Sequence, residues 1–139
     1  MEIRSLTTKE EILAQFPLLS KLTQGLTEGS LSEMLDDMLR RDYHAVGIFH
    51  EDKCVALTGY WIGTKIYSGK YLEMDNVVVE DFMRSKGLGR MLVDYCTDVA
   101  KKENCKHIML DAYVENIKAH VFYERYGFTR RGYHFLKKV

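Results

Sequence analysis

The apolar residues before position 43 recur three or four residues apart, a spacing that predicts α-helices. A first helix is expected from Lys9 to about Gln24, broken or bent at Pro17. A second helix is expected to begin with a capping box that runs from Ser30 to Glu33. The apolar stripes behind these expectations are Ile12, Leu13, Phe16, Leu19 and Leu22 in the first helix, and Leu31, Met34, Leu35 and Met38 in the second.

The spacing then changes to that of β-strands, and Ile3 to Leu6 is a further short strand candidate. Three antiparallel strands followed by alternating helices and strands are typical of a mixed α/β sheet with helices on both faces. Gly127 suits a left-handed cap at the end of the last helix. In chain order, the expected elements are strands His44–Phe49, Cys54–Ile66 and Tyr71–Val79, helix Leu88–Glu103, strand His107–Tyr113, helix Ile117–Tyr126 and a strand from Phe128.

The composition is that of a folded globular chain, with 46% hydrophobic and 29% charged residues among 139, so one domain over residues 1–139 is expected. No apolar run approaches the ~20 residues of a membrane-spanning helix, and no signal-peptide pattern opens the chain. We therefore expect a cytoplasmic protein without a membrane partner. The three cysteines and five histidines show no metal-ligand spacing, so no metal is expected.

The charge is balanced overall but divided between the two halves of the chain. Residues 1–83 carry 8 basic and 14 acidic residues, and residues 84–139 carry 12 basic and 6 acidic ones. Zero net charge gives no reason to expect a nucleic-acid partner. The division suits a site that meets an anion on one side and a cation on the other, although chance placement of surface charges explains it too. The acidic residues Glu33, Asp36 and Asp37 form either a solvated helix face or a substrate-facing one.

The segment Arg84–Arg90, "RSKGLGR", lies between the valine-rich end of a strand and a helix. Glycines let a backbone approach a ligand closely, and the free N–H groups of a first helical turn favour an anion. A Walker loop is excluded because its lysine pattern is absent. A dinucleotide fingerprint would need a glycine where Leu92 stands, although Asp111 lies near the distance of its acidic residue. A plain turn into a helix is the remaining alternative.

Two motifs together resemble the GNAT superfamily of N-acetyltransferases. The first is Arg-x-x-Gly-x-Gly after a strand, which resembles that family's acetyl-coenzyme A loop. The second lies in Glu115–Phe128, and the similarity is clear from about Tyr71 to Phe128. The resemblance implies a GNAT fold, which has a mostly antiparallel central sheet with splayed strands. It also implies acetyl-coenzyme A (acetyl-CoA) as the acetyl donor. The residues that match the second motif are Asn116, Ala119, Phe122, Tyr123, Glu124, Gly127 and Phe128.

The resemblance also implies which residues bind the cofactor. The main chain near Val78 or Val79 would donate hydrogen bonds to the pantetheine and the thioester carbonyl. Asn116 would touch the cofactor or cap the helix at Ile117, and both are compatible. The full set of expected cofactor-binding residues is Val77, Val78, Val79, Arg84, Ser85, Lys86, Gly87, Leu88, Gly89, Arg90, Asn116 and Tyr123.

Three catalytic candidates follow from the same resemblance. Tyr123 would protonate the leaving thiolate, because a phenol titrates near ~10 and stays protonated at neutral pH; its alternative is a core role. Glu73 and Asp75 lie two apart on one strand and share a face that Val77 and Val79 should continue. Either carboxylate would serve as the base that deprotonates the amine, or a water chain serves instead.

The expected activity is acetyl transfer to a primary amine of a small molecule, by direct attack in a ternary complex. The alternatives are acetylation of a protein N-terminus or lysine, and a non-catalytic coenzyme A sensor. The acceptor should be set by residues before Tyr71, above all the loop and helix from Gln24 to Arg41, with aromatic residues such as Tyr60 and Trp61. The eleven residues after Phe128 have room for one strand or a tight hairpin at Gly132, which favours a homodimer that pairs or exchanges this strand over a monomer with a charged edge.

Overall fold

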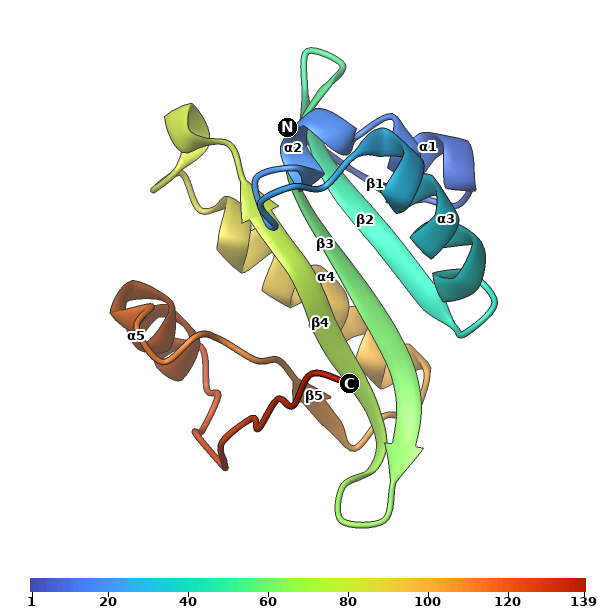
Figure 1. The fold of residues 1–139 in the computed structure, drawn as a ribbon. Helices are drawn as coiled ribbons and strands as arrows, with labels where there is room; N and C mark the ends of the chain where they lie inside the picture. The colour runs from blue at the N-terminus through green and yellow to red at the C-terminus, as the bar shows by residue number, and fades with distance from the viewer.

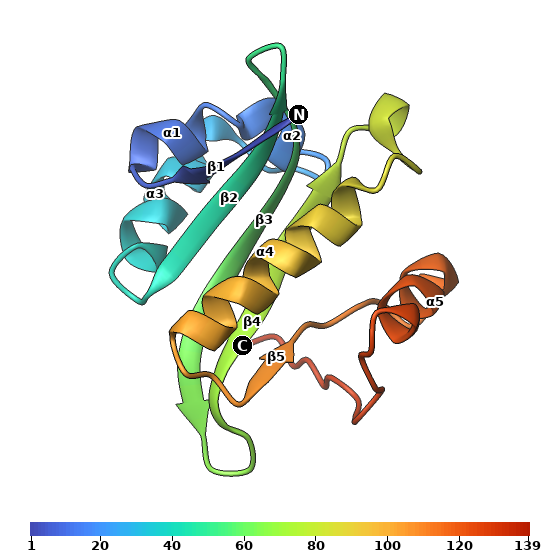
Figure 2. The same cartoon turned by 180° about the vertical axis from the view of Figure 1, so that it is seen from behind.

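The structure is a computed structural model that describes all 139 residues. The chain forms one sheet with helices on both faces (Figures 1 and 2). The sheet order is β1-β2-β3-β4-β5, antiparallel as far as β4 and parallel between β4 and β5. This agrees with the mixed sheet expected from the sequence. The strands are β1 (Glu2–Leu6), β2 (Tyr43–His50), β3 (Lys53–Lys65), β4 (Gly69–Val79) and β5 (His107–Met109).

The helices form two layers. Helices α1 to α3 cover one face of the sheet, α4 covers the other, and α5 lies beyond β5 at the edge (Figures 1 and 2). No helix is both long enough and apolar enough to cross a membrane. The helices are α1 (Lys9–Leu13), α2 (Phe16–Leu19), α3 (Glu28–Met38), α4 (Leu88–Lys102) and α5 (Ile117–Arg125), with a 3₁₀ turn, η1, at Asp81–Met83.

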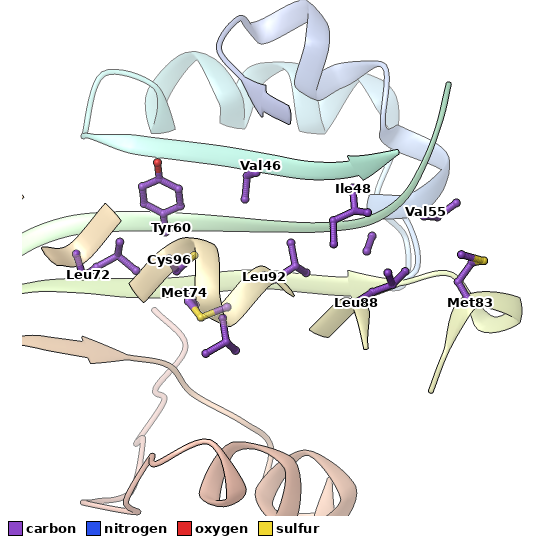
Figure 3. Packing of buried hydrophobic residues seen from close by; sticks show 13 residues of the cluster. Val46, Ile48, Val55, Tyr60, Leu72, Met74, Met83, Leu88, Leu92 and Cys96 are labelled. Carbon is purple, nitrogen blue, oxygen red and sulfur yellow. The ribbon is translucent and has the colours of Figure 1, made fainter. Parts of the chain in front are cut away.

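Each helical layer has its own hydrophobic core. Figure 3 shows the cluster between α4 and the sheet, in which Leu92 and Cys96 of α4 meet Ile48 and Leu72 from the strands. A second cluster joins α1 to α3 to the opposite face, around Ile12 and Leu35 in the helices. Burying one aliphatic side chain fully contributes about 1.5–3 kcal/mol to the stability of the fold. These clusters therefore hold in place the strands that carry the site.

The N-terminal helices differ from the prediction at two points. The expected long helix is divided into α1 and α2, and Pro17 lies in the first turn of α2, where its missing N–H has no cost. The next helix begins at Glu28, not after Ser30, because Thr27 is the N-cap and Ser30 is its capping-box partner. Thr27 Oγ1 accepts from the Ser30 N–H at 3.1 Å, and Ser30 Oγ accepts from the Thr27 N–H at 3.1 Å.

The C-terminal region differs more. The strand expected to reach Tyr113 ends at Met109, and the predicted strand or hairpin after Phe128 is wrong: residues 128–139 form no strand. A strand needs paired backbone groups, and this segment does not pair with the free edge of β5. The helix end was predicted correctly, since Gly127 has φ of 92° just after α5.

Candidate active site

Strands β4 and β5 share one end and then diverge. They pair only where Tyr71–Glu73 faces His107–Met109, and beyond this the two chains separate, as Figure 1 shows. About half of the N–H and C=O groups of a strand face each neighbour, so the remainder of β4 has an open edge on this side. The splayed sheet expected from the resemblance is therefore present.

A β-bulge interrupts β4 beside this open edge. Gly59 pairs with Asp75 while Leu57 pairs with Val78, so β4 holds one extra residue. Asn76 takes φ of 58°, a conformation that asparagine tolerates better than most residues, and its Nδ2 donates to the Tyr43 hydroxyl at 3.0 Å. The bulge changes which way the following side chains point.

The prediction that Val77 and Val79 continue the face of Glu73 and Asp75 is therefore wrong. Both valines pack on the cluster beneath α4, whereas Val78 turns into the cluster beneath α1 to α3. Strict alternation gives the wrong face after Asp75 because the extra residue shifts the strand by one. The left-handed preference of Asn76 was the signal in the sequence that could have revealed this.

The two carboxylates on β4 share a face but have different surroundings. Each oxygen of Asp75 accepts one hydrogen bond: Oδ2 accepts from Trp61 Nε1–H at 2.9 Å, and Oδ1 accepts from the Asn76 N–H at 2.9 Å. Glu73 is half-buried and accepts no hydrogen bond from the chain. Burial, with a smaller contribution from the nearby Asp111 carboxylate, raises the pKa of Glu73 above its usual range.

The Arg84–Arg90 loop ends in the first turn of α4. Gly87 is the N-cap with φ of 79°, and no side chain caps the first-turn N–H groups. Arg84 pairs with Asp81 at 3.0 Å, and Lys86 forms no ion pair. Uncapped N–H groups and an unpaired ammonium at a helix N-terminus fit a polyanion such as a pyrophosphate.

Glycine is required at the two positions of this loop for different structural reasons. At Gly87 a side chain would meet open space, and the positive φ is what requires glycine. At Gly89 a Cβ would lie 3.0 Å from Cζ of Phe122. Gly89 therefore lets α5 pack against the start of α4. The glycine spacing alone does not predict this contact, because it also suits a ligand loop.

The same packing places Tyr123 near the loop. Its half-buried ring lies 5.1 Å from the ring of Phe122 and 5.6 Å from that of Phe128, and it packs against the cluster beneath α4. Its hydroxyl has no hydrogen-bond partner in the chain, and burial raises the pKa of this phenol. Asn116 caps α5, because its Oδ1 accepts from the Ala119 N–H at 3.3 Å.

Residues before Tyr71 fall into separate environments. Tyr60 is buried beneath α4, whereas Trp61 reaches Asp75 on the opposite face. On α3, Asp36 pairs with Lys9 at 2.8 Å and Asp37 pairs with Arg41 at 3.1 Å. These exposed ion pairs favour the solvated interpretation of the acidic helix face.

A profile of the acetyltransferase (GNAT) family matches residues 9–128. The chain belongs to this family. An N-acetyltransferase of Bacillus subtilis, YhdJ, described as uncharacterized, is 30% identical over 100% of this chain and 99% of its own length. The GNAT assignment makes the chain an acyltransferase, in a family that uses acetyl-CoA as acyl donor.

Two further comparisons describe the similarity. A glucosamine 6-phosphate N-acetyltransferase of Arabidopsis thaliana is 32% identical over 65% of this chain and 62% of its own sequence. A crystal structure of glucosamine-6-phosphate N-acetyltransferase from that plant covers 99% of this chain and 97% of that one, with TM-score 0.77 and 27% identity. An acetyltransferase structure from Agrobacterium tumefaciens superposes with TM-score 0.83 over 100% of both chains at 22% identity, which shows the same fold.

Proposed function

We propose that this GNAT acetyltransferase acts as a single domain that transfers an acetyl group to a primary amine of a small molecule, by direct attack in a ternary complex. The observation that carries the proposal is the open edge of β4, where the strand leaves β5 after Glu73 and bulges at Asn76. Main-chain N–H groups near Val78 or Val79 would stabilise the negative charge that develops on the carbonyl oxygen.

The Arg84–Arg90 loop is proposed to hold the pyrophosphate of acetyl-CoA. When bound, that cofactor supplies an acetyl group activated as a thioester. The N–H groups of Leu88, Gly89 and Arg90 point out of the uncapped first turn of α4, and Arg84 and Lys86 add positive charge. Two sets of groups would line the rest of the cofactor: the backbone of Ser85 and Gly87 with the side chain of Asn116, and the β4 residues Val77, Val78 and Val79.

Glu73 is proposed as the base, in preference to Asp75. A base must have a free lone pair and a pKa raised toward neutrality, and Glu73 has both features. Both oxygens of Asp75 already accept hydrogen bonds, which suits a positioning role. Glu73 takes the proton that the amine loses, directly or through water, as the nitrogen forms its bond to the acetyl carbon.

Tyr123 is proposed as the acid. As the carbon–sulfur bond breaks, the electron pair goes to sulfur, and the Tyr123 hydroxyl donates a proton or a hydrogen bond to it. The raised pKa keeps the phenol protonated at neutral pH, and the hydroxyl is free to donate. The Arabidopsis relative is a glucosamine 6-phosphate N-acetyltransferase, and this similarity supports a small-molecule acceptor over a protein.

The test is thiol release from acetyl-CoA with a panel of amines and short peptides. Tyr123→Phe should lower kcat at least about ten-fold, while Tyr67→Phe, which removes an exposed hydroxyl in the β3–β4 turn, should not. Turnover of peptides alone would favour the protein acetyltransferase. Tight acetyl-CoA binding without turnover of any amine would favour a sensor and contradict the proposed reaction.

The homodimer is proposed from the tail. Its side chains Tyr133, Phe135 and Leu136 are 82%, 92% and 85% exposed, and β5 has a strand on one side only. Pairing with a second copy would cover both the exposed tail side chains and the free edge of β5. An unpaired strand edge favours such pairing. Light scattering should show a dimer that Phe135→Asp dissociates and Lys138→Asp does not; a monomeric parent protein would contradict this.

A further inference from the structure

A cavity of about 300 Å³ lies between helices α1 to α3 and the face of β4 that carries Asp75. Ten of its thirteen lining residues are hydrophobic, including Leu26, Met34 and Met38. The volume corresponds to about ten water molecules at ~30 Å³ each, which is the scale of a small organic molecule. Met34 is 46% exposed at its edge, so the cavity has a flexible apolar rim.

The cavity shares Asp75 with the face of β4 that carries the proposed base. Its lining includes Asp75 and Asn76, and Glu73 lies two residues before Asp75 on the same face of β4. Trp61 lines it from β3, and its register partner across the sheet is Glu73. A molecule held here therefore lies next to the carboxyl proposed as the base.

The polar end of the cavity is already ordered. Trp61 and the Asn76 backbone each donate one hydrogen bond to the Asp75 carboxylate, and the Asn76 side chain donates to Tyr43. A carboxylate has about four acceptor positions, so Asp75 keeps lone pairs for a further donor. Its negative charge favours an ammonium group as that donor.

The lining contains no lysine, arginine or histidine. The basic residues near the lining are paired elsewhere: Lys21 pairs with Glu80, Lys9 with Asp36, and Arg41 with Asp37. Phosphate recognition depends on basic side chains or uncapped helix N-termini, and α3, whose residues line the cavity, has a capped N-terminus. This environment disfavours the phosphorylated sugar named for the Arabidopsis relative.

We propose that this cavity binds the apolar body of the acceptor, which is an unphosphorylated primary amine carrying an alkyl or aryl group. The inference rests on the proposed function and specifies its substrate class. Asp75 holds the incoming ammonium, Glu73 takes its proton, and the amine nitrogen then replaces sulfur on the acetyl carbon as described above. Met34, Met38 and Leu26 contact the apolar group.

The first measurement is kcat/KM by thiol release, for propylamine, butylamine, pentylamine, hexylamine, 2-phenylethylamine and glucosamine 6-phosphate. Each added CH₂ should raise kcat/KM about 3- to 4-fold until the cavity is filled. Hexylamine should exceed glucosamine 6-phosphate by about ten-fold or more. No dependence on chain length, with glucosamine 6-phosphate the best acceptor, would overturn the inference while leaving acetyl transfer intact.

The second measurement reports binding without turnover. Trp61 is the one tryptophan of the chain, so its fluorescence reports this cavity directly. Hexylamine should change the emission saturably in the absence of acetyl-CoA, and glucosamine 6-phosphate should not. A saturable change without turnover of any amine would support the cavity assignment and contradict the proposed function. No change with any amine would overturn the inference.

A matched pair of variants locates the effect. Met34→Lys places a cation at the exposed rim and should lower kcat/KM for hexylamine about ten-fold while raising it for glucosamine 6-phosphate. Ser32→Lys adds the same charge to α3 outside the cavity lining and should change neither value. Equal effects of the two variants would show that charge on α3, and not the cavity, determines the response, which would overturn the inference.

Discussion

Residues 1–102 and residues 103–139 are packed in very different ways. All 29 buried residues lie at or before Ala100, and most of them form the two clusters on either side of the sheet. The C-terminal region instead exposes large apolar side chains: Tyr113, Val114, Ile117, Val121, Tyr133, Phe135, Leu136 and Val139. Exposed apolar surface of this extent marks a region that a ligand or partner covers.

The proposed site uses both regions. Glu73 lies on a strand fixed by the two cores, and Tyr123 lies on a helix without a fully buried residue. On this proposal the packed region would hold the acceptor, and the less buried region would adjust around the cofactor. Elements with few buried contacts open at low free energy, which is what a binding element needs.

The largest expected effect separates the stabilities of the two regions. Leu92→Ala removes a fully buried side chain from the cluster beneath α4 and should lower the free energy of unfolding by about 2–5 kcal/mol. Leu136→Ala, at an exposed tail position, should lower it by less than about 0.5 kcal/mol. Urea unfolding followed by circular dichroism measures both, and equal losses would contradict the division.

The next effect separates the two carboxylates. Glu73→Gln should lower kcat about 100-fold, in the range expected for a general base. A base works when deprotonated, so the activity of the parent enzyme should fall as the pH drops through the raised pKa of Glu73, and the variant should lose this dependence. Asp75→Asn should raise KM for the amine and keep the dependence. If Asp75→Asn lost the pH dependence and Glu73→Gln kept it, Asp75 would be the base.

A smaller effect is expected at the loop. Lys86→Ala should weaken acetyl-CoA binding up to about 5-fold, because one exposed ion pair contributes about 0.2–1 kcal/mol. Lys101→Ala removes the same charge from the opposite end of α4 and should leave the dissociation constant unchanged. Isothermal titration calorimetry measures both constants. Similar losses would mean that overall charge, and not the loop, attracts the cofactor.

The sequence predicted the strands of the packed region well and those of the looser region poorly. The bounds of β2, β3 and β4 agree with the predicted strands within two residues, because hydrophobic spacing there reflects a real core. The strand predicted after Phe128 is wrong: the segment pairs with no strand, and its apolar side chains are exposed. Spacing shows that a surface is apolar, but it does not say whether the chain itself covers it.

The candidate site was predictable by residue type but not by geometry. The resemblance pointed to Glu73, Asp75 and Tyr123, and the sequence could not separate the two carboxylates. Their difference arises from Trp61 and the bulge at Asn76, which together occupy both oxygens of Asp75. These contacts join β3 to β4 across a local register shift, and a register shift leaves no mark in the hydrophobic pattern.

The smallest expected effect is the loss of folding stability caused by the unpaired carboxyl of Glu73. Because its pKa is raised in the folded state, the folded chain binds more protons than the unfolded chain as the pH rises from about 4.5, the usual value for this group. Stability therefore falls through this interval and stays lower above the raised pKa. Glu73→Gln removes this cost and should stabilise the protein at pH 8 by less than about 0.5 kcal/mol.

The same variant should show a much smaller gain at pH 4, below the usual pKa of this group, where Glu73 is mostly protonated in both states. Urea midpoints at the two pH values measure the difference, and Glu33→Gln, at an exposed α3 position, is the control. A variant that loses activity while gaining stability identifies a group kept for chemistry at the expense of folding. If Glu73→Gln instead destabilised the protein at pH 8, the carboxylate would have a structural partner and the preference for Glu73 over Asp75 would lose its basis.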